Sequence, residues 1–215
     1  MQDHVSLFEI YEILNDYFGD LHWWPGDSPF EIIVGAILTQ NTAWKNVETA
    51  IGRLKAFDLL HPEKLMNADD QQLGELIRPA GYYRIKTRRL KAFLDFLHRK
   101  YQGDLNALFA EDLWVARNML LSVHGIGEET ADSILLYAAG KPVFVVDAYT
   151  RRIMQRHHLI GEKARYTDIQ SLFMTTLPRN TPLYNQYHAL LVNVGKQFCR
   201  KENPKCGICP LWSFR

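Results

Sequence analysis

The chain has 215 residues, of which 47% are hydrophobic and 23% charged, and its net charge is +1. This length can bury a sizeable core in one large or two small domains, and the composition is that of a globular protein. No stretch approaches the roughly 18 uninterrupted apolar residues that a membrane span requires. The N-terminal stretch is amphipathic and carries early acids, so we expect no secretory signal, a cytoplasmic location and a monomer.

Hydrophobic periodicity predicts an almost wholly α-helical protein. Apolar residues recur at helical spacing, which indicates helices over residues 5–18, 46–60, 69–77, 86–100 and 104–110. The run that begins at Phe30 predicts another helix, which ends at a polar break over residues 39–42. The apolar run 143–146 is too short and isolated to indicate a sheet.

Positive charge is concentrated in residues 78–100, whose only acid is Asp95, and an acid-rich stretch precedes this segment. The asymmetry is compatible with one basic face on an otherwise neutral protein. It is equally compatible with a solvated helix face.

The most informative stretch runs from residue 118 to residue 152. It predicts a helix ending near Ser122, a tight turn that contains Gly125 and Gly127, and a second helix over residues 128–139. Glycines two residues apart permit positive φ and expose backbone N–H groups at a helix start, which suits a phosphate. Asp147 follows, at a position where an aspartate would also cap the next helix. A phosphate-binding hairpin followed by a carboxylate indicates chemistry on a nucleic acid.

The segments LLSVHGIGEETADSIL and VVDAYTRR resemble the hairpin and the aspartate of the helix-hairpin-helix DNA glycosylases, the superfamily of endonuclease III. The resemblance extends from about residue 23 to residue 209. It implies an all-α, two-domain fold with the active-site cleft between the domains. The central helical domain would take residues 30–140, and residues 1–29 plus 141–215 would form a second domain ending in a cysteine loop. The implied partner is double-stranded DNA that contains a damaged base.

The resemblance implies a catalytic role for Asp147. Hydrolysis of an N-glycosidic bond passes through an oxocarbenium-like sugar, which a nearby carboxylate stabilises. Bifunctional relatives carry a lysine two residues beyond the last hairpin glycine, where this chain has Glu129. A carboxylate cannot form an imine, so we predict a glycosylase without lyase activity, with Glu129 in its active site. The other interpretation of Glu129 is an acid that stabilises the first turn of its helix.

The motif WWP, and LTQNT with an aromatic residue two positions on, resemble the 3-methyladenine DNA glycosylase III branch of the superfamily. This implies a pocket for an alkylated base, lined by Trp23, Trp24, Pro25 and Trp44. Alkylation makes a purine cationic, and a cation over an indole face gains ~0.5–2 kcal/mol. Alternatively, the tryptophan pair covers a core edge. The glutamine at the position of Gln40 fills, in endonuclease III relatives, the space left by the flipped nucleotide.

The segment IRPAGYYRIKTRRL resembles the matching superfamily segment and implies contacts of Arg84 and Lys86 with the DNA backbone. We interpret His188 as a core histidine and leave it out of the site. Two other functions stay open. One is an endonuclease III-like glycosylase for oxidised pyrimidines or mismatched thymine, and the other is a non-catalytic DNA-binding protein with the same hairpin.

The three cysteines cluster near the C-terminus as Cys199-x6-Cys206-x2-Cys209. This spacing resembles the 4Fe–4S loop of endonuclease III, where a fourth cysteine follows after five residues. Here that position is Arg215. Four thiolates are the usual complement of such a cluster. A labile cluster with an outside ligand, a zinc ion and an empty site all remain open.

Overall fold

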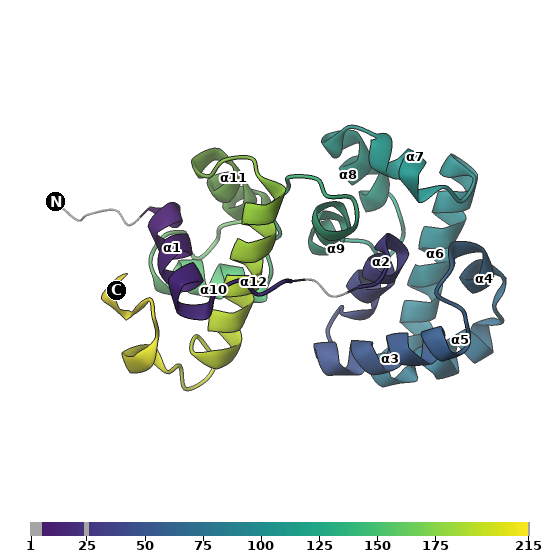
Figure 1. The fold of residues 1–215 in the computed structure, drawn as a ribbon, viewed down its shortest axis with the longest axis horizontal. Coiled ribbons are helices and arrows are strands. Elements are labelled where there is room, and N and C mark those ends of the chain that lie inside the picture. Colours follow the sequence, from purple (N-terminus) through teal and green to yellow (C-terminus); the bar gives the residue numbers. More distant parts are fainter. Residues whose placement is uncertain (1–5, 24–25, 215) are drawn as a thin grey trace. The chain divides into compact units, whose positions relative to one another are not determined.

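The structure, a computed structural model, describes residues 6–23 and 26–214 (Figure 1). The regular elements in these ranges are all helical, as the sequence predicts, and the ranges contain no strand. The chain divides into two compact units. Unit 1 takes residues 1–24 and 142–215, and unit 2 takes residues 25–141. The sequence-based boundaries of the central domain were residues 30 and 140.

Unit 2 is a helical domain whose elements follow one another with short connections. Its elements are α2 (Pro29–Leu38), α3 (Trp44–Ala56), α4 (Pro62–Asn67), α5 (Asp70–Ile77), η1 (Arg78–Ala80), α6 (Tyr83–Tyr101), α7 (Leu105–Ala110), α8 (Leu113–Leu121), α9 (Glu128–Ser133) and η2 (Ile134–Ala138).

Helix α2 forms the core of unit 2. Its sequence PFEIIVGAIL is apolar on all sides, and a helix of this kind must be buried. It packs against α3, α6, α9 and η2, as Figure 1 shows. The helix starts where Ser28 accepts a hydrogen bond from the N–H of Glu31 and Pro29 occupies the first turn. This buried helix delivers the loop of residues 39–43 to the hairpin.

Two helices of unit 2 differ from the sequence-based prediction. Helix α6 begins at Tyr83 rather than residue 86, directly after Tyr82, whose left-handed backbone (φ 46°) interrupts regular helix. The predicted helix 128–139 is α-helical only to Ser133 and then widens into a π-helical turn, η2. Such turns often lie at functional sites.

Unit 1 contains α1 (Leu7–Phe18), α10 (Ala148–Arg156), α11 (Tyr166–Thr176), α12 (Thr181–Gln197), η3 (Cys206–Ile208) and η4 (Trp212–Phe214). Helix α12 packs against both α1 and α10 (Figure 1). A Cβ at Gly195 would lie 2.3 Å from Cδ1 of Tyr149, so this glycine permits the close approach of α10 and α12. The extended segment before α10 is buried, and its Phe144 ring stacks on Phe173 with centroids 3.9 Å apart.

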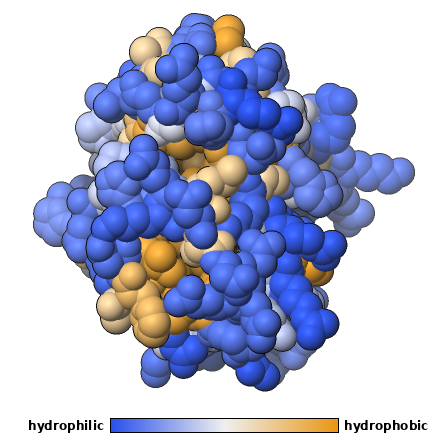
Figure 2. All heavy atoms as spheres, turned by 90° about the vertical axis from the view of Figure 1, so that its right-hand side faces the viewer, coloured by the Kyte–Doolittle hydropathy of each residue, from blue (hydrophilic) through white to orange (hydrophobic). Residues whose placement is uncertain are grey.

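Hydrophilic residues cover most of the face shown in Figure 2, and hydrophobic atoms appear there in a few small areas. Within residues 6–23 and 26–214, none of the helices combines the length and the apolar character needed to cross a membrane.

Candidate active site

The hairpin joins α8 to α9 in unit 2. Gly125 has a φ of +86°, and a Cβ there would lie 2.4 Å from Cγ of Arg89. Both the backbone conformation and the close approach of Arg89 therefore require glycine at this position. Gly127 is the N-cap of α9 and is exposed, with extended backbone. The turn thus presents backbone at the start of the second helix, as the sequence predicts.

A buried ion pair ties together the two helices of the hairpin. The Arg117 guanidinium, on α8, donates to both carboxylate oxygens of Asp132, on α9, at 2.7 and 3.1 Å. The Asp132 side chain is fully buried. The same guanidinium donates to Glu128 at 3.3 Å. Glu128 is therefore occupied by an internal partner, whereas Glu129 is exposed on the first turn of α9.

Gln40 contacts the hairpin directly, although the two lie far apart in sequence. Its amide nitrogen donates to the Gly125 carbonyl at 3.0 Å and to the Thr130 hydroxyl at 2.8 Å. Its amide oxygen accepts a hydrogen bond from the guanidinium of Arg89, on α6. In this structure Gln40 is therefore bound to protein groups. Sequence analysis missed Arg89 because nothing local distinguishes it from the other basic residues of α6.

The two basic residues expected to contact DNA differ in environment. Arg84 is exposed, with its guanidinium carbon 5.8 Å from the centre of the Tyr83 ring. Lys86 is only 1% exposed, and its ammonium donates to the carbonyls of Leu38 and Ala80 at 2.8 and 2.7 Å. Burial, together with the charge of Arg89, lowers the pKa of Lys86 to about 8. The expected DNA contact of Lys86 is therefore corrected: its ammonium serves the end of α2 and of η1.

Asp147 is the N-cap of α10 in unit 1. One carboxylate oxygen accepts the Thr150 N–H at 2.7 Å, and the other lies 3.6 Å from Nε2 of His188. The Asp147 side chain is 11% exposed. Burial by itself raises the pKa of this carboxyl, but His188 and Thr150 outweigh burial, so the net pKa lies below its usual value. Asp147 is thus a largely buried carboxylate that favours its charged form.

His188 is the residue of this environment that sequence analysis set aside. It is buried on α12, as a core histidine would be, and at the same time it faces the Asp147 carboxylate. Its place on the apolar side of an amphipathic helix gave no sign of a charged partner. Only the packing of α10 against α12 brings the two side chains together.

The aromatic residues expected in the base pocket are distributed over both units. In unit 1 Trp23 is half-buried, and the Lys196 ammonium lies 5.4 Å from its ring centre. In unit 2 Trp44 is the first residue of α3 and is also half-buried. Trp24 and Pro25 lie outside the described residues. The pocket composed of these four residues remains a prediction.

The three cysteines surround one small cavity at the end of unit 1. Cys199 is buried, Cys206 and Cys209 are half-buried, and the cavity of about 20 Å³ is also lined by His157 and Trp212. An Arg156 N–H donates to the Cys199 sulfur at 3.4 Å. A volume that accommodates about one water does not admit a cluster of eight atoms. The described residues also contain no group of three His, Cys, Asp or Glu side chains placed to hold a metal ion. As arranged here, the loop does not fit the 4Fe–4S cluster that its spacing implies.

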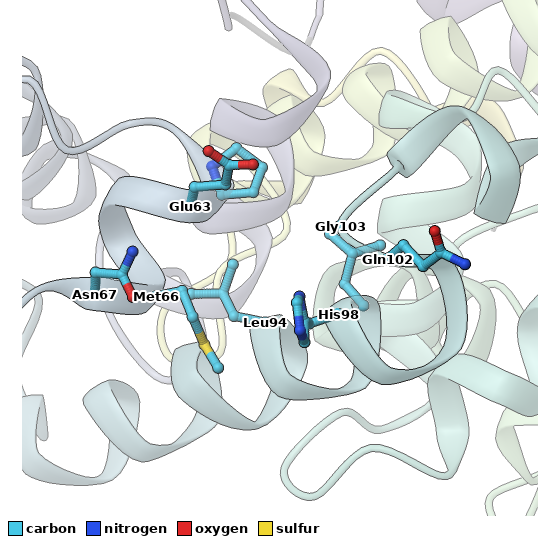
Figure 3. A pocket seen from close by; sticks show the side chains of 9 residues that line it. Glu63, Met66, Asn67, Leu94, His98, Gln102 and Gly103 are labelled. Atoms are coloured by element: carbon cyan, nitrogen blue, oxygen red, sulfur yellow. The ribbon is translucent and has the colours of Figure 1, made fainter.

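A separate hollow of about 360 Å³ lies between α4 and α6 (Figure 3). Apolar Met66 and Leu94 line it together with polar Glu63 and His98. None of its lining residues belongs to the hairpin or to its Gln40 and Arg89 contacts, so it is not part of the candidate site.

The fold, the hairpin and the capping aspartate define a class of protein, and a comparison with protein families agrees. The family model described as "HhH-GPD superfamily base excision DNA repair protein" matches residues 34–179, which include both the hairpin and Asp147. The chain belongs to this superfamily of helix-hairpin-helix, endonuclease III-like DNA glycosylases.

Individual relatives carry related names. The chain is 48% identical over 209 residues to "Putative DNA repair glycosylase MJ1434" of Methanocaldococcus jannaschii, covering 97% of this chain and 94% of that protein. It is 29% identical to an endonuclease III of Sulfolobus acidocaldarius, covering 86% and 80% of the two chains. Among solved structures, it resembles the H. pylori 3-methyladenine DNA glycosylase MagIII bound to 1,N6-ethenoadenine, with a TM-score of 0.76 and 29% identity. That alignment covers 90% of this chain and 98% of the other.

Proposed function

We propose that this DNA glycosylase hydrolyses the N-glycosidic bond of alkylated purines, of the 3-methyladenine type, in double-stranded DNA and leaves an abasic site. The observation that carries the proposal is Asp147, a largely buried carboxylate whose pKa lies below its usual value. Burial of a charged group is costly unless the group is compensated, and here His188 and the Thr150 N–H compensate it. Such an arrangement supplies fixed negative charge where a cationic intermediate forms.

The proposed reaction uses this charge electrostatically. As the bond between base and sugar breaks, positive charge develops on the sugar ring, and the Asp147 carboxylate stabilises it. The same carboxylate orients the attacking water or takes its proton. The oxygen that accepts the Thr150 N–H is held in place by the helix cap, so the carboxylate does not have to reorganise during the reaction.

The aromatic residues support an alkylated purine as the substrate. The indole of Trp23 already has the Lys196 ammonium 5.4 Å from its ring centre, which illustrates that this ring is accessible to a cation. A base alkylated on a ring nitrogen carries a positive charge and is attracted to indole faces in the same way. The charge also weakens the glycosidic bond, so little general-acid assistance is needed. The likeness to the 3-methyladenine glycosylase MagIII is consistent with this substrate class.

The absence of lyase activity follows from the second helix of the hairpin. Strand cleavage by this route requires an amine that forms a Schiff base with the abasic sugar. Glu129 occupies the relevant position on the first turn of α9. Lys141, the next lysine along the chain, follows the helix and donates to the Glu111 carbonyl at 2.6 Å.

The proposed DNA contacts lie on the hairpin and on α6. Backbone N–H groups around Gly125 and Gly127 would bind a phosphate, and the exposed guanidinium of Arg84 would bind the backbone nearby. Because Gln40 is hydrogen-bonded to Gly125, its loop belongs to the same surface of unit 2. The base must leave the stack before reaction, which costs a few kcal/mol and favours damaged bases.

The decisive experiment replaces Asp147 with asparagine. Asparagine caps a helix as well as aspartate does, so Asp147→Asn preserves the start of α10 and removes only the charge. We expect excision of 3-methyladenine to fall by at least about 100-fold while DNA affinity is retained. The matched control is Asp69→Asn, the same substitution at the exposed N-cap of α5, which should leave excision unchanged. Full activity in Asp147→Asn would refute the assignment.

A substrate panel tests the lesion class. Wild-type protein is given duplexes that contain 3-methyladenine, an oxidised pyrimidine or a mismatched thymine, and the abasic product is quantified. We expect the alkylated purine to be excised fastest. Faster excision of either pyrimidine lesion would favour an endonuclease III-like substrate. Binding without an abasic product from any duplex would favour a non-catalytic DNA-binding protein.

A further inference from the structure

Arg89 contacts both parts of unit 2 that are proposed to bind DNA. Its aliphatic stem lies against Gly125, where a Cβ would approach Cγ and Cδ of Arg89 to 2.4 and 2.7 Å. Its guanidinium donates to the amide oxygen of Gln40. The side chain is half-buried, and its Nε is fully enclosed without a hydrogen-bond partner. Arg89 is therefore packed into the protein at a point where a surface arginine would extend toward solvent.

The Gln40 amide has little capacity left for any other partner. A primary amide has two N–H donors, and the two hydrogen bonds from its nitrogen, to Gly125 and Thr130, use both. The oxygen accepts from a guanidinium, which is always charged and forms a stronger hydrogen bond than a neutral donor. Three partners on two segments hold one side chain in a single orientation.

We propose that Arg89 is a positioning residue for DNA engagement: it fixes Gln40 against the hairpin, so that the loop of residues 39–43 and the hairpin approach DNA as one rigid element. This inference rests on the proposed function. It assigns Gln40 the role of a strut that remains bound to Gly125 when DNA is present. It also assigns Arg89 no phosphate contact of its own.

The test is a double-mutant cycle on DNA affinity. Arg89→Met keeps the stem that covers Gly125 and removes the guanidinium, and Gln40→Met keeps the size of the side chain and removes the amide. Affinity for a duplex with a stable abasic-site analogue is measured by fluorescence anisotropy for both single variants and for the double variant. We expect each single variant to bind about tenfold more weakly and the double variant to bind no more weakly than the single ones, because coupled residues are not additive. Independent, multiplying losses would overturn the proposal.

Salt dependence separates positioning from direct phosphate contact. Loss of one phosphate contact reduces the slope of log affinity against log salt concentration by about 0.9, whereas loss of a positioning group leaves it unchanged. We expect an unchanged slope for Arg89→Met and a reduced slope for Arg84→Met. Arg53→Met, at an exposed cation on α3, is the control for removal of charge. A reduced slope in Arg89→Met, or affinity equal to that of Arg53→Met, would overturn the proposal.

Two further measurements keep the result interpretable. Thermal unfolding of each variant identifies any loss of folded protein, and Arg89→Lys retains the charge without the planar fork. We expect Arg89→Lys to bind as weakly as Arg89→Met, and wild-type affinity in Arg89→Lys would contradict the role of the Gln40 contact. Excision by the wild-type protein is measured separately. Failure of the glycosylase assignment therefore appears as absent product, whereas failure of this inference appears only in the affinity cycle.

Discussion

The imidazole of His188 faces the carboxylate of Asp147, with Nε2 and Oδ2 3.6 Å apart and both side chains largely buried. The pair depends on the packing of α12 against α10, which Gly195 permits because a larger residue would collide with Tyr149. The helix cap holds one carboxylate oxygen, and His188 faces the other. The position and the charge of the proposed catalytic group are therefore set by two independent contacts.

Replacing His188 should shift the pH dependence of excision. The ionised form of Asp147 is the active one, and it exists above the pKa of this carboxyl. Burial is the largest influence on that pKa and raises it, while His188 counteracts burial. In His188→Asn the pKa of Asp147 therefore rises, and the acidic limb of the rate profile moves to higher pH. The measurement is the single-turnover rate against pH.

The matched control is the same substitution in the Asp147→Asn background, where no ionisable carboxylate remains. There His188→Asn should change neither the residual rate nor its pH dependence. An acidic limb that stays in place in the single variant would mean that His188 has no influence on the ionisation of Asp147.

Sequence reasoning located the features that depend on neighbouring residues. Helix α1 follows from apolar periodicity, and the hairpin follows from Gly125 and Gly127, whose conformational requirement is local. The contacts that complete the site join residues distant in sequence. No pattern within one helix announces that Arg89 meets Gln40 or that His188 meets Asp147.

Lys86 illustrates a misinterpreted local pattern. It was expected to contact DNA because it lies in a basic segment, yet it shares a helical face with Leu90, Phe93 and Leu97, all of which are buried. The spacing of these four residues places Lys86 toward the core. Its buried ammonium is accommodated because two carbonyls at helix ends accept its protons. The apolar face of α6 predicts this position better than charge does.

Introducing a lysine at position 129 should confer Schiff-base chemistry. Wild-type protein should yield no covalent adduct when incubated with an abasic-site duplex and borohydride, because Glu129 supplies no amine. Glu129→Lys places an amine on the exposed first turn of α9, and we expect a trapped adduct. Glu128→Lys is the control: it adds the same amine at the neighbouring position, and we expect no adduct. An adduct in the wild-type protein would contradict the monofunctional assignment.

The ion pair between Arg117 and Asp132 should contribute strongly to the stability of the hairpin. Arg117→Met removes the guanidinium partner of a fully buried carboxylate, and such a loss typically costs about 3–5 kcal/mol of unfolding free energy. The double variant Arg117→Met, Asp132→Leu should recover most of this loss, because it also removes the buried charge. Urea unfolding measures both. Arg165→Met breaks an exposed ion pair with Asp168 and should have little effect. An equally small effect of Arg117→Met would refute the prediction.

The cysteine loop should lack a stoichiometric 4Fe–4S cluster, because three thiols with Arg215 in the fourth position surround a cavity of only about 20 Å³. Freshly purified protein should contain far less than four iron and four sulfide per chain and show no visible charge-transfer absorbance. In the native protein, a thiol reagent should modify half-buried Cys206 and Cys209 faster than buried Cys199. Arg215→Cys restores four thiolates, and we expect this variant to gain iron, sulfide and colour. Four iron per wild-type chain would show that the loop opens to admit a cluster and takes its fourth ligand from elsewhere.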